Sequence, residues 1–125
     1  MKQIEQDIVQ SMRFGVSFHT GTSSSYRPDS DGYRDNLIFD KNDFKYELWG
    51  NVIATGNTQD RNIKVSDCGY ATATTTSRLN AVFAGLEIPM AVSVRKGKTV
   101  FTIHGQEVKP GMLHYYAGEW NVTIA

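Results

Sequence analysis

The segment from residue 69 to residue 80 is the part of the sequence best suited to binding a ligand. It reads Gly-Tyr-Ala-Thr-Ala-Thr-Thr-Thr-Ser-Arg-Leu-Asn, and the pattern predicts a helix start with Thr76 or Ser77 as the N-cap. Free backbone N–H groups at a helix start converge on one point and carry partial positive charge, which suits a phosphate group. Arg78 can add a bidentate contact, and Asn80 can hydrogen-bond a base edge or a ribose hydroxyl.

The hydroxyls of Thr74, Thr75 and Ser77 are predicted to join the same site. The same segment has a simpler interpretation. Tyr70 to Thr76 is β-prone, so its threonines can lie on the wet face of a strand that is followed by an ordinary helix cap. The residue types alone leave both interpretations open.

Aromatic and basic side chains elsewhere can complete a nucleotide site. Trp49, Tyr70 and Phe101 are candidates to stack on a base, at about 1–3 kcal/mol per base. Arg95 and Phe101 belong to a predicted basic hairpin around Lys96-Gly97-Lys98, which can form a charged lip over an anion. The alternatives are core packing for each aromatic and a solvated turn for the hairpin.

Motifs for catalysis and metal binding are missing from the sequence. It has no glycine-rich phosphate loop, no HExxH and no nucleophile elbow. Residues 29–32 hint at a calcium loop but lack its bidentate glutamate. None of His19, His104 and His114 begins a His-x-Thr/Ser motif, and Cys68 is predicted to be buried and inert. The sequence therefore predicts a binding protein without catalytic residues, metal or cofactor.

Composition sets the class of protein. The chain has 125 residues, 40% of them hydrophobic and 21% charged, and we expect one soluble domain over residues 1–125. Thirteen basic and 13 acidic side chains give a net charge of zero, which argues against polymeric nucleic acid as a partner. Residues 1–60 carry 6 basic and 9 acidic side chains (−3), and residues 61–125 carry 7 and 4 (+3). Self-association of opposite patches, or a local site for an anion, fits this asymmetry. No segment is apolar enough to span a membrane or to act as a signal peptide.

The hydrophobic pattern predicts an α+β fold with an N-terminal helix, a mainly antiparallel sheet and one short inserted helix. The first helix covers Met1 to Phe14 and stops at Gly15, and the second covers Ser77 to Ala84 and stops at Gly85. His19 to Gly32 reads as a long loop. The predicted strands are 16–18, 36–39, 44–49, 52–54, 63–66, 92–95, 99–103, 112–116 and 120–124.

Two segments carry a resemblance to a known group of proteins. Leu-Trp-Gly-Asn-Val-Ile-Ala at 48–54 and Gly-Tyr-x-Thr-x-Thr-Thr-x-Ser-Arg-Leu-Asn-Ala-Val at 69–82 resemble a recurrent family of small bacteriophage proteins. Tyr70 stands where tryptophan is usual in that motif, and either ring can stack. The N-terminal helix, the Phe-His-Thr-Gly segment at 18–21 and the overall length look most like the first-described Thoeris anti-defence proteins.

The resemblance implies a sponge for a signalling nucleotide in the cytoplasm of the infected bacterial host. Members bind glycocyclic ADP-ribose, the signal made by the host's TIR-domain enzyme, and hold it without cleaving it. They are dimers or larger assemblies with ligand sites near subunit interfaces, and some also bind cyclic oligonucleotides. The motif positions that match, and are therefore predicted to bind ligand, are Trp49, Asn51, Tyr70, Thr74, Thr75, Ser77, Arg78 and Asn80.

Two other functions fit the same sequence. A phage inhibitor that blocks a host defence complex through its surface would use exposed aromatic residues and bind no small molecule. A phage accessory protein without an anti-defence role would use the motif helix only to build its fold. The two differ in whether the purified protein captures a host protein.

Overall fold

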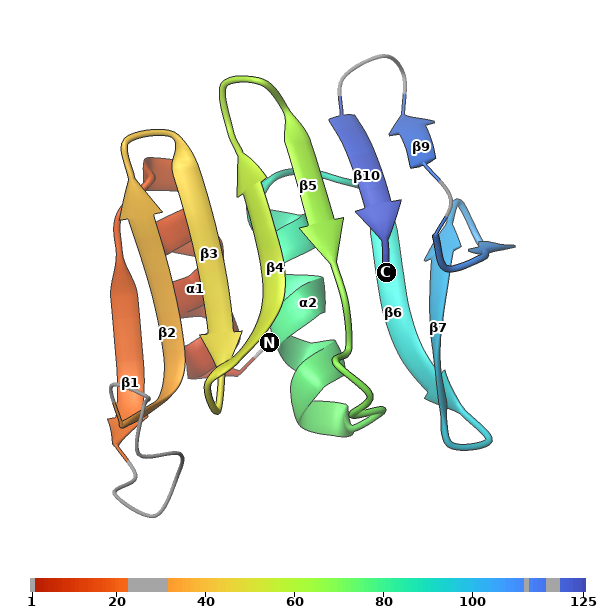
Figure 1. Cartoon of the computed structure of the whole chain (residues 1–125), viewed down its shortest axis with the longest axis horizontal. Helices are drawn as coiled ribbons and strands as arrows, with labels where there is room; N and C mark the ends of the chain where they lie inside the picture. The colour runs from red at the N-terminus through yellow and green to blue at the C-terminus, as the bar shows by residue number, and fades with distance from the viewer. Residues whose placement is uncertain (1, 23–31, 112, 117–119) are drawn as a thin grey trace.

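The computed structural model describes residues 2–22, 32–111, 113–116 and 120–125, and it has the predicted α+β architecture (Figure 1). The described elements form two helices, a seven-stranded sheet and a three-stranded sheet. Their bounds are α1 (Gln3–Phe14), β1 (Phe18–Thr22), β2 (Tyr33–Asp40), β3 (Asp43–Leu48), β4 (Asn51–Asn57), β5 (Asn62–Val65), α2 (Ala73–Gly85), β6 (Met90–Arg95), β7 (Lys98–Ile103), β8 (Gln106–Val108), β9 (Leu113–Tyr116) and β10 (Trp120–Ile124).

The large sheet has the strand order β1-β2-β3-β4-β5-β10-β9. Every neighbouring pair is antiparallel except β5 and β10, which run parallel. The chain leaves β5 to build α2 and the small sheet β6-β7-β8 before it returns as β10, and a parallel pair requires such a long crossover. The last strand therefore pairs within its own chain.

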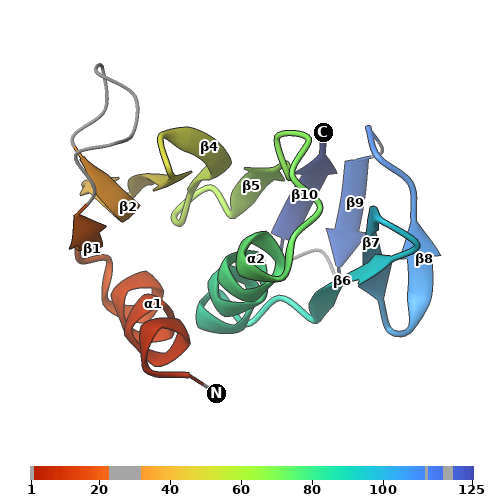
Figure 2. The same cartoon turned by 90° about the horizontal axis from the view of Figure 1, so that it is seen from below.

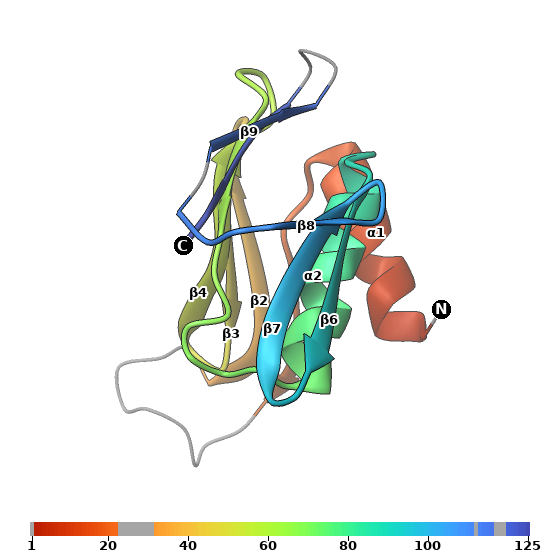
Figure 3. The ribbon, with the colours of Figure 1, turned by 90° about the vertical axis from the view of Figure 1, so that its right-hand side faces the viewer.

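Both helices cover one face of the large sheet and lie side by side (Figure 2). The small sheet lies on the same side, next to α2 (Figure 3). The core between these layers contains apolar side chains from both helices and from the inner face of the sheet. Its fully or almost fully buried members include Ile8, Met12, Leu37, Tyr46, Ile53, Ile63, Val65, Leu79, Val82, Phe83, Val122 and Ile124.

The strand predicted at 44–49 is confirmed as β3, and its residues alternate between core and solvent. Phe44, Tyr46 and Leu48 are buried against the helices, and Lys45 between them is exposed. The first helix also follows its pattern. Its apolar stripe is buried, and Gly15 ends it in the left-handed conformation at φ 66°.

The second helix begins earlier than predicted. It covers Ala73–Gly85 with Thr72 as the N-cap, so a strand over Tyr70–Thr76 and a cap at Thr76 or Ser77 are wrong. The hydroxyls of the threonines explain the difference. Thr72 Oγ1 accepts the Thr75 N–H at 3.2 Å, and Thr76 Oγ1 donates to the Ala73 carbonyl at 3.0 Å. Thr75 is also buried, so tertiary packing overrides the strand preference of the run.

Smaller differences concern individual strands. The first strand is Phe18–Thr22, not 16–18, and it takes the beginning of the predicted loop; residues 23–31 of that loop lie outside the described residues. The hairpin of β9 and β10 is confirmed, with its turn at 117–119 also outside them. The short strand β8 was not predicted.

Close contact between the helices depends on Gly85, because a Cβ there would lie 2.6 Å from Met12 Cβ and 2.9 Å from the Val9 carbonyl oxygen. We expect Gly85→Ala to lower the free energy of unfolding. Overpacking against backbone costs about 1–3 kcal/mol, which outweighs the helix-propensity gain of about 0.5–1 kcal/mol. Urea denaturation measures the change, with Gln10→Ala on the exposed face of α1 as the control. Equal stability of Gly85→Ala and the wild type would show that this crossing is not tight.

Candidate functional site: a buried carboxylate shared by two arginines

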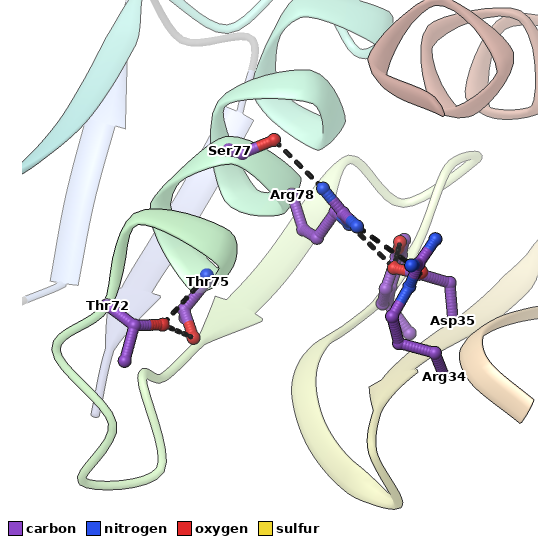
Figure 4. Close-up of polar contacts among 7 residues, drawn as sticks. Arg34, Asp35, Thr72, Thr75, Ser77 and Arg78 are labelled. Atoms are coloured by element: carbon purple, nitrogen blue, oxygen red, sulfur yellow. Dashed lines mark hydrogen bonds and ion pairs between the residues drawn. The ribbon is translucent and has the colours of Figure 1, made fainter. Parts of the chain in front are cut away.

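The interior of the protein contains a carboxylate, that of Asp35. It lies on β2 and is fully buried. Its Oδ1 accepts hydrogen bonds from Tyr46 Oη at 2.6 Å and Arg78 Nε at 2.7 Å, and its Oδ2 accepts one from Arg34 Nε at 2.7 Å. Figure 4 shows Arg34 and Arg78 approaching this carboxylate from the sheet and from the helix. One anion therefore joins β2, β3 and α2.

Arg78 lies within α2, in its second turn, and its guanidinium turns towards the sheet. Its Nη2 is 3.4 Å from Asp35 Oδ2, and its Nη1 donates to Ser77 Oγ at 3.1 Å. Only 6% of the residue is exposed. The prediction that Arg78 lies at the helix start is wrong. Asp35 and Ser77 accept hydrogen bonds from all three of its nitrogens, and its contact with a ligand phosphate stays a prediction.

Hydrogen bonding sets the ionisation of this cluster. Burial alone raises the pKa of Asp35, but hydrogen bonds from Arg78, Tyr46 and Arg34 outweigh it and hold that pKa below its usual value. Burial and the adjacent Asp35 carboxylate raise the pKa of Tyr46 far above its usual value. Burial lowers the pKa of Arg78, but Asp35 more than offsets this. Asp35 and Arg78 are therefore charged, and Tyr46 is a neutral donor.

The cluster carries excess positive charge. Two guanidinium groups against one carboxylate leave a net charge of +1 on the three hydrogen-bonded groups. Glu5 on α1 contributes only the weakest of the Coulombic effects on the pKa of Arg78. The Arg34 side chain is 38% exposed, whereas that of Arg78 is 7% exposed. Arg34 is therefore the guanidinium of this pair that a ligand can reach.

Asn80 has a structural partner. Its Nδ2 donates to the Val92 carbonyl at 2.9 Å, and its Oδ1 accepts the Val92 N–H at 2.8 Å. The side chain thus pairs with β6 as a neighbouring strand would, and it ties α2 to the small sheet. Both polar ends of this amide are used within the chain, and its contact with a base or a ribose stays a prediction.

Most of the other predicted ligand residues come from one end of the molecule. There β2 and β4 begin, β3 and β5 end, α2 begins and the β6–β7 turn lies (Figure 1). We call it the Arg34 end. The predicted residues contributed by elements that start or stop there are Trp49, Asn51, Tyr70, Thr74, Thr75, Ser77 and Arg95.

Exposure separates these residues into two groups. Tyr70 is 52% exposed and Arg95 is exposed, so both are open to a ligand. Thr75 is buried, and Trp49 is half-buried with its backbone N–H donating to the Arg34 carbonyl. Phe101 is only 4% exposed and packs in the core, as the alternative interpretation had it, and its stacking on a ligand stays a prediction.

Cys68 and the described groups of metal-ligating types add no further reactive cluster to this one. Cys68 is exposed and not buried as predicted, and its thiol donates to the Val52 carbonyl at 3.1 Å. Within residues 2–22, 32–111, 113–116 and 120–125, no group of three or more His, Cys, Asp or Glu side chains is placed to hold a metal ion. Neither of the two described helices is long and apolar enough to cross a membrane.

Sequence reasoning missed Arg34, Asp35 and Tyr46. A signal for Asp35 was present, because Asp35, Leu37 and Phe39 alternate on one strand and therefore share a face. An acid at a core-facing position needs a buried cation or donor. The tyrosine at 46 is on the core-facing side of the next strand, so its hydroxyl was the available neutral donor.

These features define the protein as a small α+β protein in which a helix is fastened to a sheet by a buried ion cluster. A family model described as Kyanoviridae Gp96 protein matches residues 1–122. The chain therefore belongs to this family of bacteriophage proteins, and the predicted phage origin is confirmed. No curated protein and no solved structure matches the chain.

The charge on Asp35 gives a pH-dependent prediction. Because folding lowers the pKa of Asp35, its contribution to stability is present above the unfolded-state value of about 3.9 and is lost as pH falls through the folded-state pKa. We expect Asp35→Asn to lower the free energy of unfolding by about 3–5 kcal/mol at pH 7, because it leaves Arg78 buried without its anion. The difference from wild type in urea denaturation should shrink below about pH 4.

Asp40→Asn is the matched control, on the exposed end of the same strand. It should change stability little at either pH. A difference between Asp35→Asn and wild type that stays constant from pH 7 to pH 3 would mean that folding does not lower the pKa of Asp35.

The pairing of Asn80 with β6 gives a second prediction. Asn80→Ala leaves both polar backbone groups of Val92 without this partner, which costs about 1–3 kcal/mol per buried group. We expect a lower free energy of unfolding and faster amide hydrogen exchange at Val92. Asn80→Asp keeps the acceptor for the Val92 N–H. Its free energy of unfolding should therefore lie between those of the wild type and Asn80→Ala. Unchanged stability of Asn80→Ala would instead support a ligand-binding role for the amide.

Proposed function

We propose that this phage protein binds and sequesters a cyclic ADP-ribose-type signalling nucleotide, glycocyclic ADP-ribose, without degrading it, and so blocks Thoeris signalling. The observation that carries the proposal is the pair of guanidinium groups on one carboxylate, with the Arg34 side chain 38% exposed. A local net charge of +1 in a protein of zero overall charge suits a pyrophosphate. The resemblance of the motif to anti-defence proteins supplies the ligand class.

The structure changes which arginine we assign to the pyrophosphate. Arg34 keeps its Nε on Asp35, so its guanidinium is oriented before a ligand arrives. Arg78 holds the other side of the carboxylate from inside the protein. In this proposal Arg34 contacts the ligand, and Asp35 and Arg78 position Arg34.

The other requirements of such a site are a stacking platform and hydroxyl groups. Tyr70, 52% exposed in the segment before α2, is the best-placed ring for adenine. Thr74 and Ser77, in the first turns of α2, and Asn51, at the start of β4, supply polar groups at the Arg34 end. Holding a nucleotide without cleaving it needs only these contacts.

The proposal includes a homodimer or larger assembly that helps to enclose the ligand. Phe14 is 75% exposed and Val16 is 57% exposed, close in sequence to the edge strand β1. Exposed apolar residues beside an unpaired strand edge favour association with another chain. A pocket between subunits encloses more of a ligand than the surface of one small domain does.

The test is thermal unfolding with and without a panel of cyclic ADP-ribose isomers and cyclic nucleotides. A ligand present at about a thousand times its dissociation constant adds about 4 kcal/mol of stability, which raises Tm by several degrees. We expect one cyclic ADP-ribose isomer to give this shift and to be recovered with unchanged mass after heat release. Arg34→Gln should abolish the shift, and Arg13→Gln on the exposed end of α1 should retain it.

Two results would contradict the proposal. A melting temperature that no member of the panel changes would exclude nucleotide sequestration and favour inhibition through protein contact, tested by pull-down from host lysate. A full shift in Arg34→Gln would exclude Arg34 from the site. Far-UV circular dichroism of that variant checks that Asp35, which keeps Arg78 and Tyr46, still holds the fold together.

A further inference from the structure

The face of the large sheet opposite the helices carries a second polar surface. No described helix or strand covers this face over β4, β5 and β10 (Figures 2 and 3). Alternation puts Ile63 and Val65 of β5 in the core, so Lys64 between them faces outwards. The register places Thr55 of β4 and Thr123 of β10 on either side of Lys64. We call this surface the outer groove.

The outer groove is hollowed in two adjoining places. One hollow has a volume of about 350 Å³ and lies over β4, β5 and the segment that follows β5. The other has a volume of about 210 Å³ and lies over β4, β5 and β10. Thr55 and Lys64 line both hollows, so the two adjoin. The larger hollow alone reaches the lower end of the range of about 300–1,000 Å³ that small-molecule sites occupy.

An unsatisfied acceptor lies in the smaller hollow. Asn121 lines it, and its Oδ1 is buried with no hydrogen-bond partner among the residues that the structure describes. The neighbouring Asn62 is different, because its Oδ1 already accepts the Asn57 N–H at 3.1 Å. Buried acceptors in native proteins are nearly always paired, so Asn121 Oδ1 calls for a donor that the described residues do not supply.

The charged side chain of the outer groove is Lys64. It is the only charged side chain among the described residues that line the two hollows, and none of the described ion pairs includes it. Lys45 lies on the same face two strands away but forms an ion pair with Glu47 at 3.1 Å. Lys64 is thus available to an anion, whereas Lys45 is held by its neighbour.

We propose that the outer groove binds a small phosphorylated sugar. Its phosphate lies on Lys64, and a sugar hydroxyl donates to Asn121 Oδ1 while others contact Thr55 and Thr123. No aromatic side chain lines either hollow among the described residues, so a stacked nucleobase is not the group recognised here. This site lies on the other face of the sheet from α2 and does not depend on the function proposed for the Arg34 end.

Titration of the ¹⁵N-labelled full chain with ribose 5-phosphate and glucose 6-phosphate, followed by NMR, tests the proposal. At least one of them should give saturable amide shifts at Thr55, Lys64, Asn121 and Thr123. Ribose alone and inorganic phosphate alone should each bind at least about tenfold more weakly, because each lacks one set of contacts.

Matched variants test the assigned residues. Lys64→Met should weaken binding of the sugar phosphate about tenfold or more, and Asn121→Ala about fivefold or more, whereas Lys45→Met should change it less than about twofold. Absence of shifts in the groove with both sugar phosphates overturns the proposal, as does equal binding of inorganic phosphate alone. Equal weakening by Lys45→Met and Lys64→Met overturns the assignment to Lys64. Arg34→Gln should leave binding of the sugar phosphate intact. This variant therefore distinguishes failure of the outer-groove proposal from failure of the function proposed for the Arg34 end.

Discussion

The Asp35 carboxylate is the constraint on which the arrangement of sheet and helix depends. Moving a carboxylate out of water costs several kcal/mol, and the structure offsets that cost with three donors from three elements. A slip of β2 by one residue would turn Asp35 to the other face and leave Arg78 buried without an anion. The cluster therefore fixes the register of β2 against β3 and the rotation of α2 about its axis at the same time.

The motif helix is fastened on two sides. Arg78 ties it to the large sheet, and Asn80, two residues later, ties it to the small sheet through the backbone of β6. Leu79 between them is fully buried in the core. The polar residues that resemble a ligand-binding motif are thus largely used to assemble the fold, and Thr72 caps the helix start in the same way. The packing of this helix can therefore require particular residues at the motif positions without any contact to a ligand.

In our two proposals, binding is therefore assigned to residues outside this motif. They use Arg34 beside its carboxylate and Lys64 in the outer groove. The two residues belong to different surfaces, and we assign different ligands to them. The Arg34 end has an exposed ring, Tyr70, for a base. The outer groove has amides and hydroxyls but no described ring, which suits a sugar.

Sequence alone determined the α+β class, the N-terminal helix with its Gly15 stop, and the position of β3, because these follow from local periodicity and capping. It also placed the helix that carries Arg78, although not its start, because the β preference of the threonine run competed with the capping by Thr72. Tertiary structure alone decided the roles of Arg78, Asn80 and Phe101. Arg78 pairs with Asp35, 43 residues away, Asn80 pairs with the backbone of Val92, and Phe101 packs in the core. A single sequence does not reveal which distant groups compensate a buried charge or amide.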